Sequence, residues 1–112
     1  LRDAALSLCD INPLTTDARR WDALGALVRA CNRVRGYGDF CHYHLLARGA
    51  LDVVVESDVN ILDIAALAVI VREAGGVFTD LDGAELTLET TSVAAAATAT
   101  LQQEVRVRLA GA

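Results

Sequence analysis

The sequence predicts an α/β fold with helices packed on a sheet, because short apolar runs alternate with segments of helical periodicity. The clearest strand is residues 52–56, where three consecutive valines between two acids predict burial on both faces. The clearest helix carries an apolar stripe at three- and four-residue steps, formed by Trp21, Leu24, Leu27, Val28 and Cys31. Because it lies on this stripe, Trp21 is expected to be in the core. With 112 residues, 54% of them hydrophobic, the chain is expected to form one domain.

The first half of the chain contains an apolar segment and two predicted helices. Residues 6–11 form either a short strand or the start of a loop. Thr16 is expected to cap the first helix, and the two glycines within residues 32–38 end it. A second helix is predicted over residues 39–48, followed by Gly49 in the left-handed conformation that ends many helices.

The second half continues the alternation of strands and helices. After the valine strand, residues 58–62 are expected to form a loop, and a helix is expected to begin at Asp63 and end before Gly75. The remaining elements are a strand at 77–79, a turn at Asp82 and Gly83, a weaker strand at 92–97 and a closing helix at 101–109.

Composition and charge exclude several classes of function. The net charge of −5 argues against nucleic-acid binding, which needs clustered basic residues. Three widely spaced cysteines form neither a disulfide framework nor a zinc pattern, so a reduced, cytoplasmic location is expected. The longest apolar run, residues 64–71, is too short to span a membrane. The chain begins with Leu1 rather than Met, which suggests processing or a piece of a longer protein.

Acidic residues concentrate in the middle of the chain. Residues 39–89 contain ten Asp and Glu against two Arg, a net charge of −8. This pattern is typical of a solvated face, and it also fits a site for divalent cations, which prefer hard oxygen ligands.

Three weaker motifs favour structural interpretations. Gly36-Tyr37-Gly38 begins like a dinucleotide fingerprint, but Cys41 stands where the third glycine is needed. His42 and His44 lie two residues apart on a predicted helix and cannot chelate one ion together, so they are expected to be packing or surface histidines. Asp80-Leu81-Asp82-Gly83 lacks the later ligands of a calcium loop, and a β-turn is expected there.

Three acids fall where α/β folds commonly place ligands. Glu56 ends the valine strand, Asp58 follows it, and Asp63 opens the next helix. On local pattern alone, Asp63 is better interpreted as the N-cap of its helix, and the two roles do not exclude each other.

Five linked motifs resemble the inositol-monophosphatase family, and more narrowly its bacterial histidinol-phosphatase branch. In order they are Gly38-Asp39, Leu46-Ala47-x-Gly49, Asp52-x-x-x-Glu56, Asp63-Ile64-Ala65-Ala66-Leu67 and Glu73-Ala74-Gly75-Gly76-Val77-x-Thr79-Asp80-x-Asp82-Gly83. Phe40 and Tyr43 after the first motif, and Leu67 in the fourth, are similar to that branch rather than to inositol-type members.

The resemblance implies a magnesium-dependent phosphomonoesterase with a layered αβαβα fold. It implies that Asp63 is a Mg²⁺ ligand and that Glu56 contacts the substrate beyond its phosphate. It also places Gly38 and Asp39 in the loop that reads the substrate. A carboxylate at position 39 suits the cationic amine of histidinol phosphate better than a neutral polyol. Leu62 departs from the family pattern, which usually has an aromatic residue before the metal-binding aspartate.

The resemblance also implies that residues 1–112 are a C-terminal α/β portion of the family's fold. The family's Glu-Glu pair and Asp-Pro-x-Asp-Gly segment have no match in this sequence. The expected function is therefore that of a histidinol-phosphate phosphatase of histidine biosynthesis, inactive without the missing N-terminal half and homodimeric when full length. The alternatives are a phosphatase of the same family that acts on inositol phosphates or another small phosphorylated metabolite, and a non-catalytic remnant or binding module.

Overall fold

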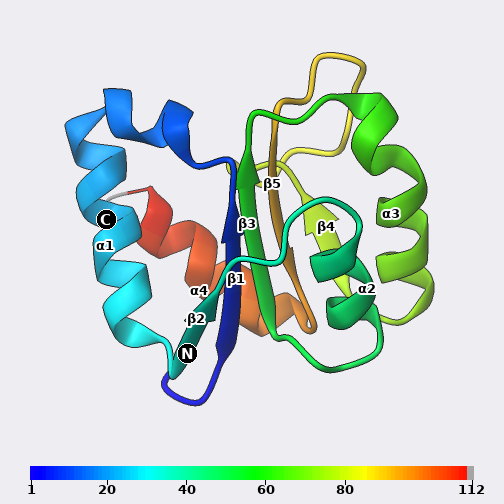
Figure 1. The fold of residues 1–112 in the computed structure, drawn as a ribbon, viewed down its shortest axis with the longest axis horizontal. Coiled ribbons are helices and arrows are strands. Elements are labelled where there is room, and N and C mark those ends of the chain that lie inside the picture. Colours follow the sequence, from blue (N-terminus) through cyan, green and yellow to red (C-terminus); the bar gives the residue numbers. More distant parts are fainter. Residues whose placement is uncertain (111–112) are drawn as a thin grey trace.

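The computed structural model describes residues 1–110, which form a five-stranded mixed sheet with helices on both faces (Figure 1). The strands lie in the order β2-β1-β3-β5-β4, with β1 parallel to β2 and β3, and β5 antiparallel to β3 and β4. The elements are β1 (Ala5–Cys9), a 3-10 helix η1 (Asn12–Thr16), α1 (Ala18–Ala30), β2 (Arg33–Arg35), α2 (Cys41–Ala47), β3 (Val53–Ser57), α3 (Ile61–Glu73), β4 (Val77–Thr79), β5 (Ser92–Ala96) and α4 (Ala99–Leu109). The predicted α/β class is confirmed.

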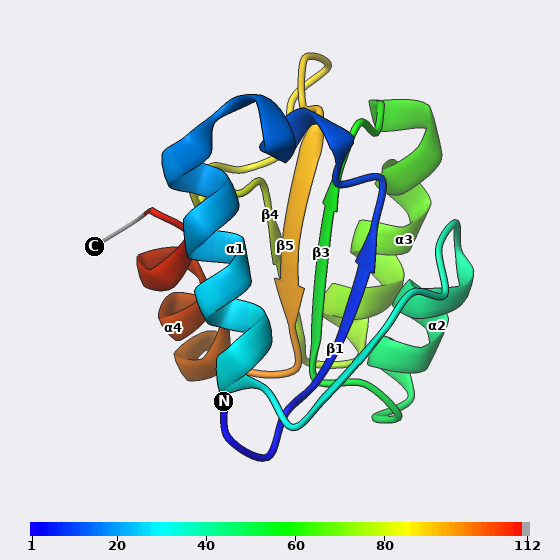
Figure 2. The same ribbon diagram turned by 60° about the vertical axis from the view of Figure 1, so that its left-hand side comes forward.

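Two apolar cores fill the space between the two faces of the sheet and the helices that cover them. Helices α1 and α4 cover one face and α2 and α3 the other, as the two views show (Figures 1 and 2). The valine strand contributes to both cores, because Val53 and Val55 point to the α1/α4 side and Val54 to the α2/α3 side. All five residues of β3 are buried, as predicted for a central strand with both faces covered.

Two sequence expectations are wrong in this structure, and one strand was not predicted. Asp17, rather than Thr16, caps α1 by accepting the backbone N–H groups of the first turn, while Thr16 ends η1. Trp21 is 44% exposed, because it lies at the margin of the α1 stripe whose centre is buried. The segment after α1 contains the strand β2, which pairs with β1 at the edge of the sheet.

The start of α3 also differs from expectation. The helix begins at Ile61, and its N-cap is Asn60, whose side chain accepts the backbone N–H groups of Leu62 and Asp63. Asp63 lies at the third helical position, and its Oδ2 atom accepts a hydrogen bond from the backbone N–H of Asn60, which completes a capping box. Asp63 is therefore part of the cap without being the cap residue.

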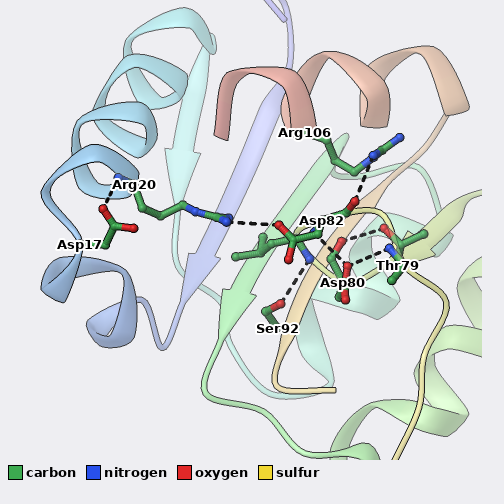
Figure 3. Close-up of polar contacts among 9 residues, drawn as sticks. Asp17, Arg20, Thr79, Asp80, Asp82, Ser92 and Arg106 are labelled. Carbon is green, nitrogen blue, oxygen red and sulfur yellow. Dashed lines mark hydrogen bonds and ion pairs between the residues drawn. The ribbon is translucent and has the colours of Figure 1, made fainter. Parts of the chain in front are cut away.

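The loop between β4 and β5 is tied to both helices of the α1/α4 face (Figure 3). Asp80 closes the predicted β-turn, because its Oδ1 atom accepts the backbone N–H groups of Asp82 and Ala84 at 2.8 Å each. Arg20 of α1 donates to the Asp82 carboxylate at 3.3 Å, and Arg106 of α4 donates to the Asp82 carbonyl at 3.4 Å.

Within residues 1–110, no helix is long and apolar enough to cross a membrane.

Candidate functional site

The candidate site lies where the parallel strands β1 and β3 end. Cys9, the last residue of β1, pairs in register with Glu56 of β3, so the residues that follow each strand meet at the same edge of the sheet. Asp10 directly follows β1, and Asp58 directly follows β3. This edge is the place where open α/β sheets bind ligands.

A pocket of about 170 Å³ occupies this edge, and five of its eight lining side chains are carboxylates. The acids singled out in the sequence, Asp39, Glu56, Asp58 and Asp63, all line it. Among the described residues, the lining set includes neither Arg nor Lys. It consists of Asp10, Asp39, Tyr43, Glu56, Asp58, Val59, Asp63 and Ile64.

Gly38 supports the pocket without lining it. Its φ of +68° is a left-handed conformation that favours glycine, and an added Cβ would lie 3.1 Å from the Sγ of Cys9. Gly38 therefore allows the loop between β2 and α2 to approach the end of β1 closely, which brings Asp39 to the pocket.

Three of the pocket's aspartates have left-handed backbones. Asp10, Asp39 and Asp58 have φ values of +50°, +47° and +73°, and they are the non-glycine residues with positive φ in the described chain. Asp is among the few residue types that tolerate this conformation, which nonetheless costs free energy. The turns that hold these carboxylates at the pocket are therefore strained turns, a feature that often accompanies functional sites.

Glu56 is the most buried of the five acids, at 3% exposure. Its Oε1 atom accepts hydrogen bonds from the Tyr43 hydroxyl at 2.5 Å and from the Nε2 of His42 at 3.3 Å. Burial by itself would raise the pKa of Glu56, but the hydrogen bonds from His42 and Tyr43 outweigh it and lower the pKa below the ordinary value. Glu56 is therefore an ionised carboxylate at neutral pH.

The groups beside Glu56 respond to its charge. Partial burial and the charge of Glu56 raise the pKa of Asp10, and burial together with the charges of Asp10 and Glu56 raises the pKa of the Cys9 thiol. Burial and the same carboxylate also raise the pKa of Tyr43, which remains a neutral hydrogen-bond donor. These shifts indicate a pocket whose negative charge is only partly offset by its own residues.

Asp63 lies at the mouth of the pocket with an exposed side chain. Only its Oδ2 atom takes part in the capping box, so the second carboxylate oxygen has no partner among residues 1–110. Carboxylate oxygens are hard donors of the kind that Mg²⁺ prefers, and the pocket's donor set therefore fits that ion. Leu62, the residue before Asp63, is 92% exposed.

Two polar lining residues were not identified as site residues from the sequence. Asp10 reaches the pocket only because β1 pairs with β3, a contact between residues far apart in the chain. Tyr43, noted only as part of a family motif, provides the hydroxyl that contacts Glu56. An acid directly after an apolar segment was the one available signal for Asp10. His42 is buried and His44 is exposed, so one is a packing histidine and the other a surface histidine, as expected.

The sequence profile of the inositol monophosphatase family matches residues 5–110. The chain belongs to this family. It is 43% identical over 83 residues to a histidinol-phosphatase of Mycobacterium tuberculosis, an alignment that covers 74% of this chain and 32% of the relative. It is 47% identical over 64 residues to a histidinol-phosphatase of Streptomyces coelicolor, covering 57% of this chain and 24% of the relative.

A solved inositol monophosphatase from Zymomonas mobilis has the same fold. It superposes with a TM-score of 0.84 at 27% identity, and the match covers 98% of this chain and 43% of that chain. The chain spans a third or less of the length of the two curated relatives, and it corresponds to a C-terminal part of the family's fold. The predicted family and the predicted part of its fold are confirmed.

Proposed function

We propose that this chain forms the substrate-side wall of a magnesium-dependent phosphomonoesterase whose substrate carries a cationic group, with histidinol phosphate as the first candidate. The observation that carries the proposal is the convergence of five carboxylates on one small pocket. Asp39, Glu56 and Asp63 match positions of the family's motifs, and the two similar histidinol-phosphatases support this branch.

The charge of the pocket requires cations. A phosphate dianion would be repelled by five carboxylates, so the phosphate needs a divalent ion between it and the protein. Asp63 would hold magnesium through the carboxylate oxygen that the capping box leaves free. When bound, magnesium holds the phosphate and favours ionisation of the attacking water.

The remaining acids act on the part of the substrate beyond the phosphate. Glu56 is ionised, and it accepts a hydrogen bond from a hydroxyl or ammonium group of the substrate. Asp39, held at the pocket by its left-handed loop, attracts the cationic amine. Asp10 and Asp58 add to the negative potential that favours a cationic substrate over a neutral polyol.

We expect the chain by itself to release no phosphate. The Glu-Glu pair and the Asp-Pro-x-Asp-Gly segment, to which the family resemblance assigns most of the metal ligands, do not occur in its sequence. The missing half of the enzyme is therefore a required partner in this proposal.

A hybrid enzyme tests the function. This chain replaces the matching segment of the M. tuberculosis histidinol-phosphatase, so that the relative supplies the preceding part of the fold. The hybrid is expected to hydrolyse histidinol phosphate in the presence of Mg²⁺. Asp39→Asn, which removes a charge but tolerates the left-handed backbone, is expected to lower kcat/KM for histidinol phosphate more than for p-nitrophenyl phosphate.

A second candidate substrate is an inositol phosphate, which the similarity to the Z. mobilis inositol monophosphatase favours. The same hybrid decides between them. A higher kcat/KM for inositol 1-phosphate than for histidinol phosphate would replace the first candidate with the second. A soluble, folded hybrid that hydrolyses neither ester would favour a non-catalytic remnant.

A further inference from the structure

A buried chain of hydrogen bonds lies behind the pocket and ends at Glu56. It starts at Ser7 of β1, continues through His42 of α2 and reaches Glu56 of β3. Ser7 and His42 have no exposed surface, and Glu56 is 3% exposed. The Ser7 Oγ lies 3.0 Å from Nδ1 of His42, and Nε2 of His42 lies 3.3 Å from Oε1 of Glu56. Neither Ser7 nor His42 lines the pocket.

The partners of each atom fix where the protons lie. Ionised Glu56 can only accept, so Nε2 of His42 must carry the proton of that bond. The Ser7 Oγ accepts the backbone N–H of Tyr37 at 3.2 Å, and its own hydrogen has one acceptor among the described residues, Nδ1 of His42. The arrangement consistent with these contacts is therefore Ser7 O–H donating to Nδ1 and Nε2–H donating to Glu56.

The two donors to Glu56 reach the same oxygen. His42 and Tyr43 both contact Oε1, and within residues 1–110 no donor contacts Oε2. Glu56 lines the pocket, and the side chain of Asp10, which also lines it, is the other polar group beside the Glu56 carboxylate. One oxygen of the carboxylate is thus held by the protein, and the other remains available to a ligand.

We propose that Ser7 and His42 are positioning residues: Ser7 sets the tautomer of His42, and His42 together with Tyr43 orients Glu56 so that its Oε2 atom faces the substrate. The inference rests on the proposed function, because it assigns Glu56 to the part of the substrate beyond the phosphate. It adds two residues that do not touch the substrate and that act through Glu56. Because the bonds join β1, α2 and β3, they also link the two parallel strands of the site to the helix beside them.

Nuclear magnetic resonance of the chain tests the hydrogen bonds without catalysis. The ring ¹⁵N signals of His42 are expected to show a neutral ring with its proton on Nε2, and Ser7→Ala is expected to shift the Nδ1 signal. The carboxyl ¹³C signal of Glu56 is expected to titrate at higher pH in His42→Leu and to return toward the wild-type value in His42→Gln, which restores an N–H donor. The other groups that face Glu56, namely Tyr43, Asp10 and Cys9, are unchanged in these variants. A proton on Nδ1 of His42, or a Glu56 carboxyl that titrates at the same pH in wild type and His42→Leu, would overturn the proposal.

Kinetics of the hybrid test the positioning role. His42→Leu is expected to raise KM for histidinol phosphate by about tenfold, the worth of one hydrogen bond to a charged group, with kcat/KM for p-nitrophenyl phosphate unchanged within about twofold. His42→Gln is expected to recover most of the loss, and His44→Leu, at the exposed histidine of the same helix, to have no effect. Equal losses for both esters would show a merely structural His42. A wild-type hybrid inactive on histidinol phosphate would instead refute the proposed substrate, and the resonance result would still decide the inference.

Discussion

Replacing Tyr43 by Phe removes one hydroxyl from the centre of the site and leaves the aromatic packing in place. The Tyr43 side chain is 1% exposed, and its ring contacts that of Phe78 with centroids 5.2 Å apart. Its hydroxyl donates to the buried Glu56 carboxylate at 2.5 Å. A hydrogen bond to a charged acceptor contributes about 1.5–3 kcal/mol, and Glu56 keeps the bond from His42. The free energy of unfolding is therefore expected to fall by about 1.5–3 kcal/mol at neutral pH.

The effect of Tyr43→Phe should depend on pH in a defined direction. Although burial opposes it, the bonds from His42 and Tyr43 lower the folded pKa of Glu56 below its ordinary value of 4.5. A lowered folded pKa stabilises the fold above the unfolded pKa, and this stabilisation is lost as the pH falls through the folded pKa. The difference between wild type and Tyr43→Phe is expected to be constant above pH 5 and to shrink below about pH 4.5.

Urea unfolding followed by far-ultraviolet circular dichroism measures this difference at each pH. Tyr37→Phe is the matched control, because Tyr37 is 48% exposed and its hydroxyl has no hydrogen-bond partner among residues 1–110. The control is expected to change the free energy of unfolding by less than about 0.5 kcal/mol. A Tyr43→Phe loss below about 0.5 kcal/mol, or one that does not vary with pH, would refute the account of Glu56 as a buried, ionised acceptor.

Three further substitutions test other parts of the structure. Asp10→Asn is expected to raise the melting temperature at pH 7, because partial burial and the charge of Glu56 raise the folded pKa of Asp10. A carboxyl group with a raised folded pKa destabilises the fold as the pH rises above its ordinary pKa of 3.8. A gain in melting temperature that persists at pH 3 would contradict this. Gly76→Ala is expected to lower the free energy of unfolding in urea by about 1–3 kcal/mol, since the new Cβ would lie 3.0 Å from a backbone carbonyl oxygen of β5. The Cβ of Gly75→Ala would meet open space, so this variant should lose about 1 kcal/mol, for its positive φ alone. Equal losses in the two variants would argue against crowding at Gly76. Asn60→Ala removes the N-cap of α3 and is expected to cost about 1 kcal/mol, with a neutral result counting against the capping box.

The sequence predicts those elements whose signals are local. Three consecutive valines define β3, and Gly49 ends α2 with a φ of +84°, as expected for a left-handed cap. The strand β2 was missed because Arg33–Arg35 contains one apolar residue, and it is a strand only through its pairing with β1. Trp21 was wrongly predicted to be buried, because helical spacing identifies the apolar stripe of α1 but does not show how far the rest of the protein covers the edge of that stripe.

The candidate site was predicted in part for the same reason. Family motifs identified Asp39, Glu56 and Asp63, and the structure brings these three to one pocket. Asp10 could not be found from local pattern, because its position depends on the parallel register between β1 and β3. The hydrogen bonds of His42 likewise depend on α2 packing over two strands, so the sequence indicated only a packing histidine.

In the proposed function, this chain supplies a metal ligand and the acidic substrate wall of a magnesium-dependent phosphatase. The most direct measurement is phosphate release from histidinol phosphate by the hybrid enzyme, with and without Mg²⁺, in wild type and Asp63→Asn. Glu73→Gln, at the other end of α3, is the control. We expect Mg²⁺-dependent release that falls about a hundredfold or more in Asp63→Asn, equivalent to about 2.7 kcal/mol or more of transition-state stabilisation, and that is unchanged in Glu73→Gln. Near wild-type turnover in Asp63→Asn would contradict it.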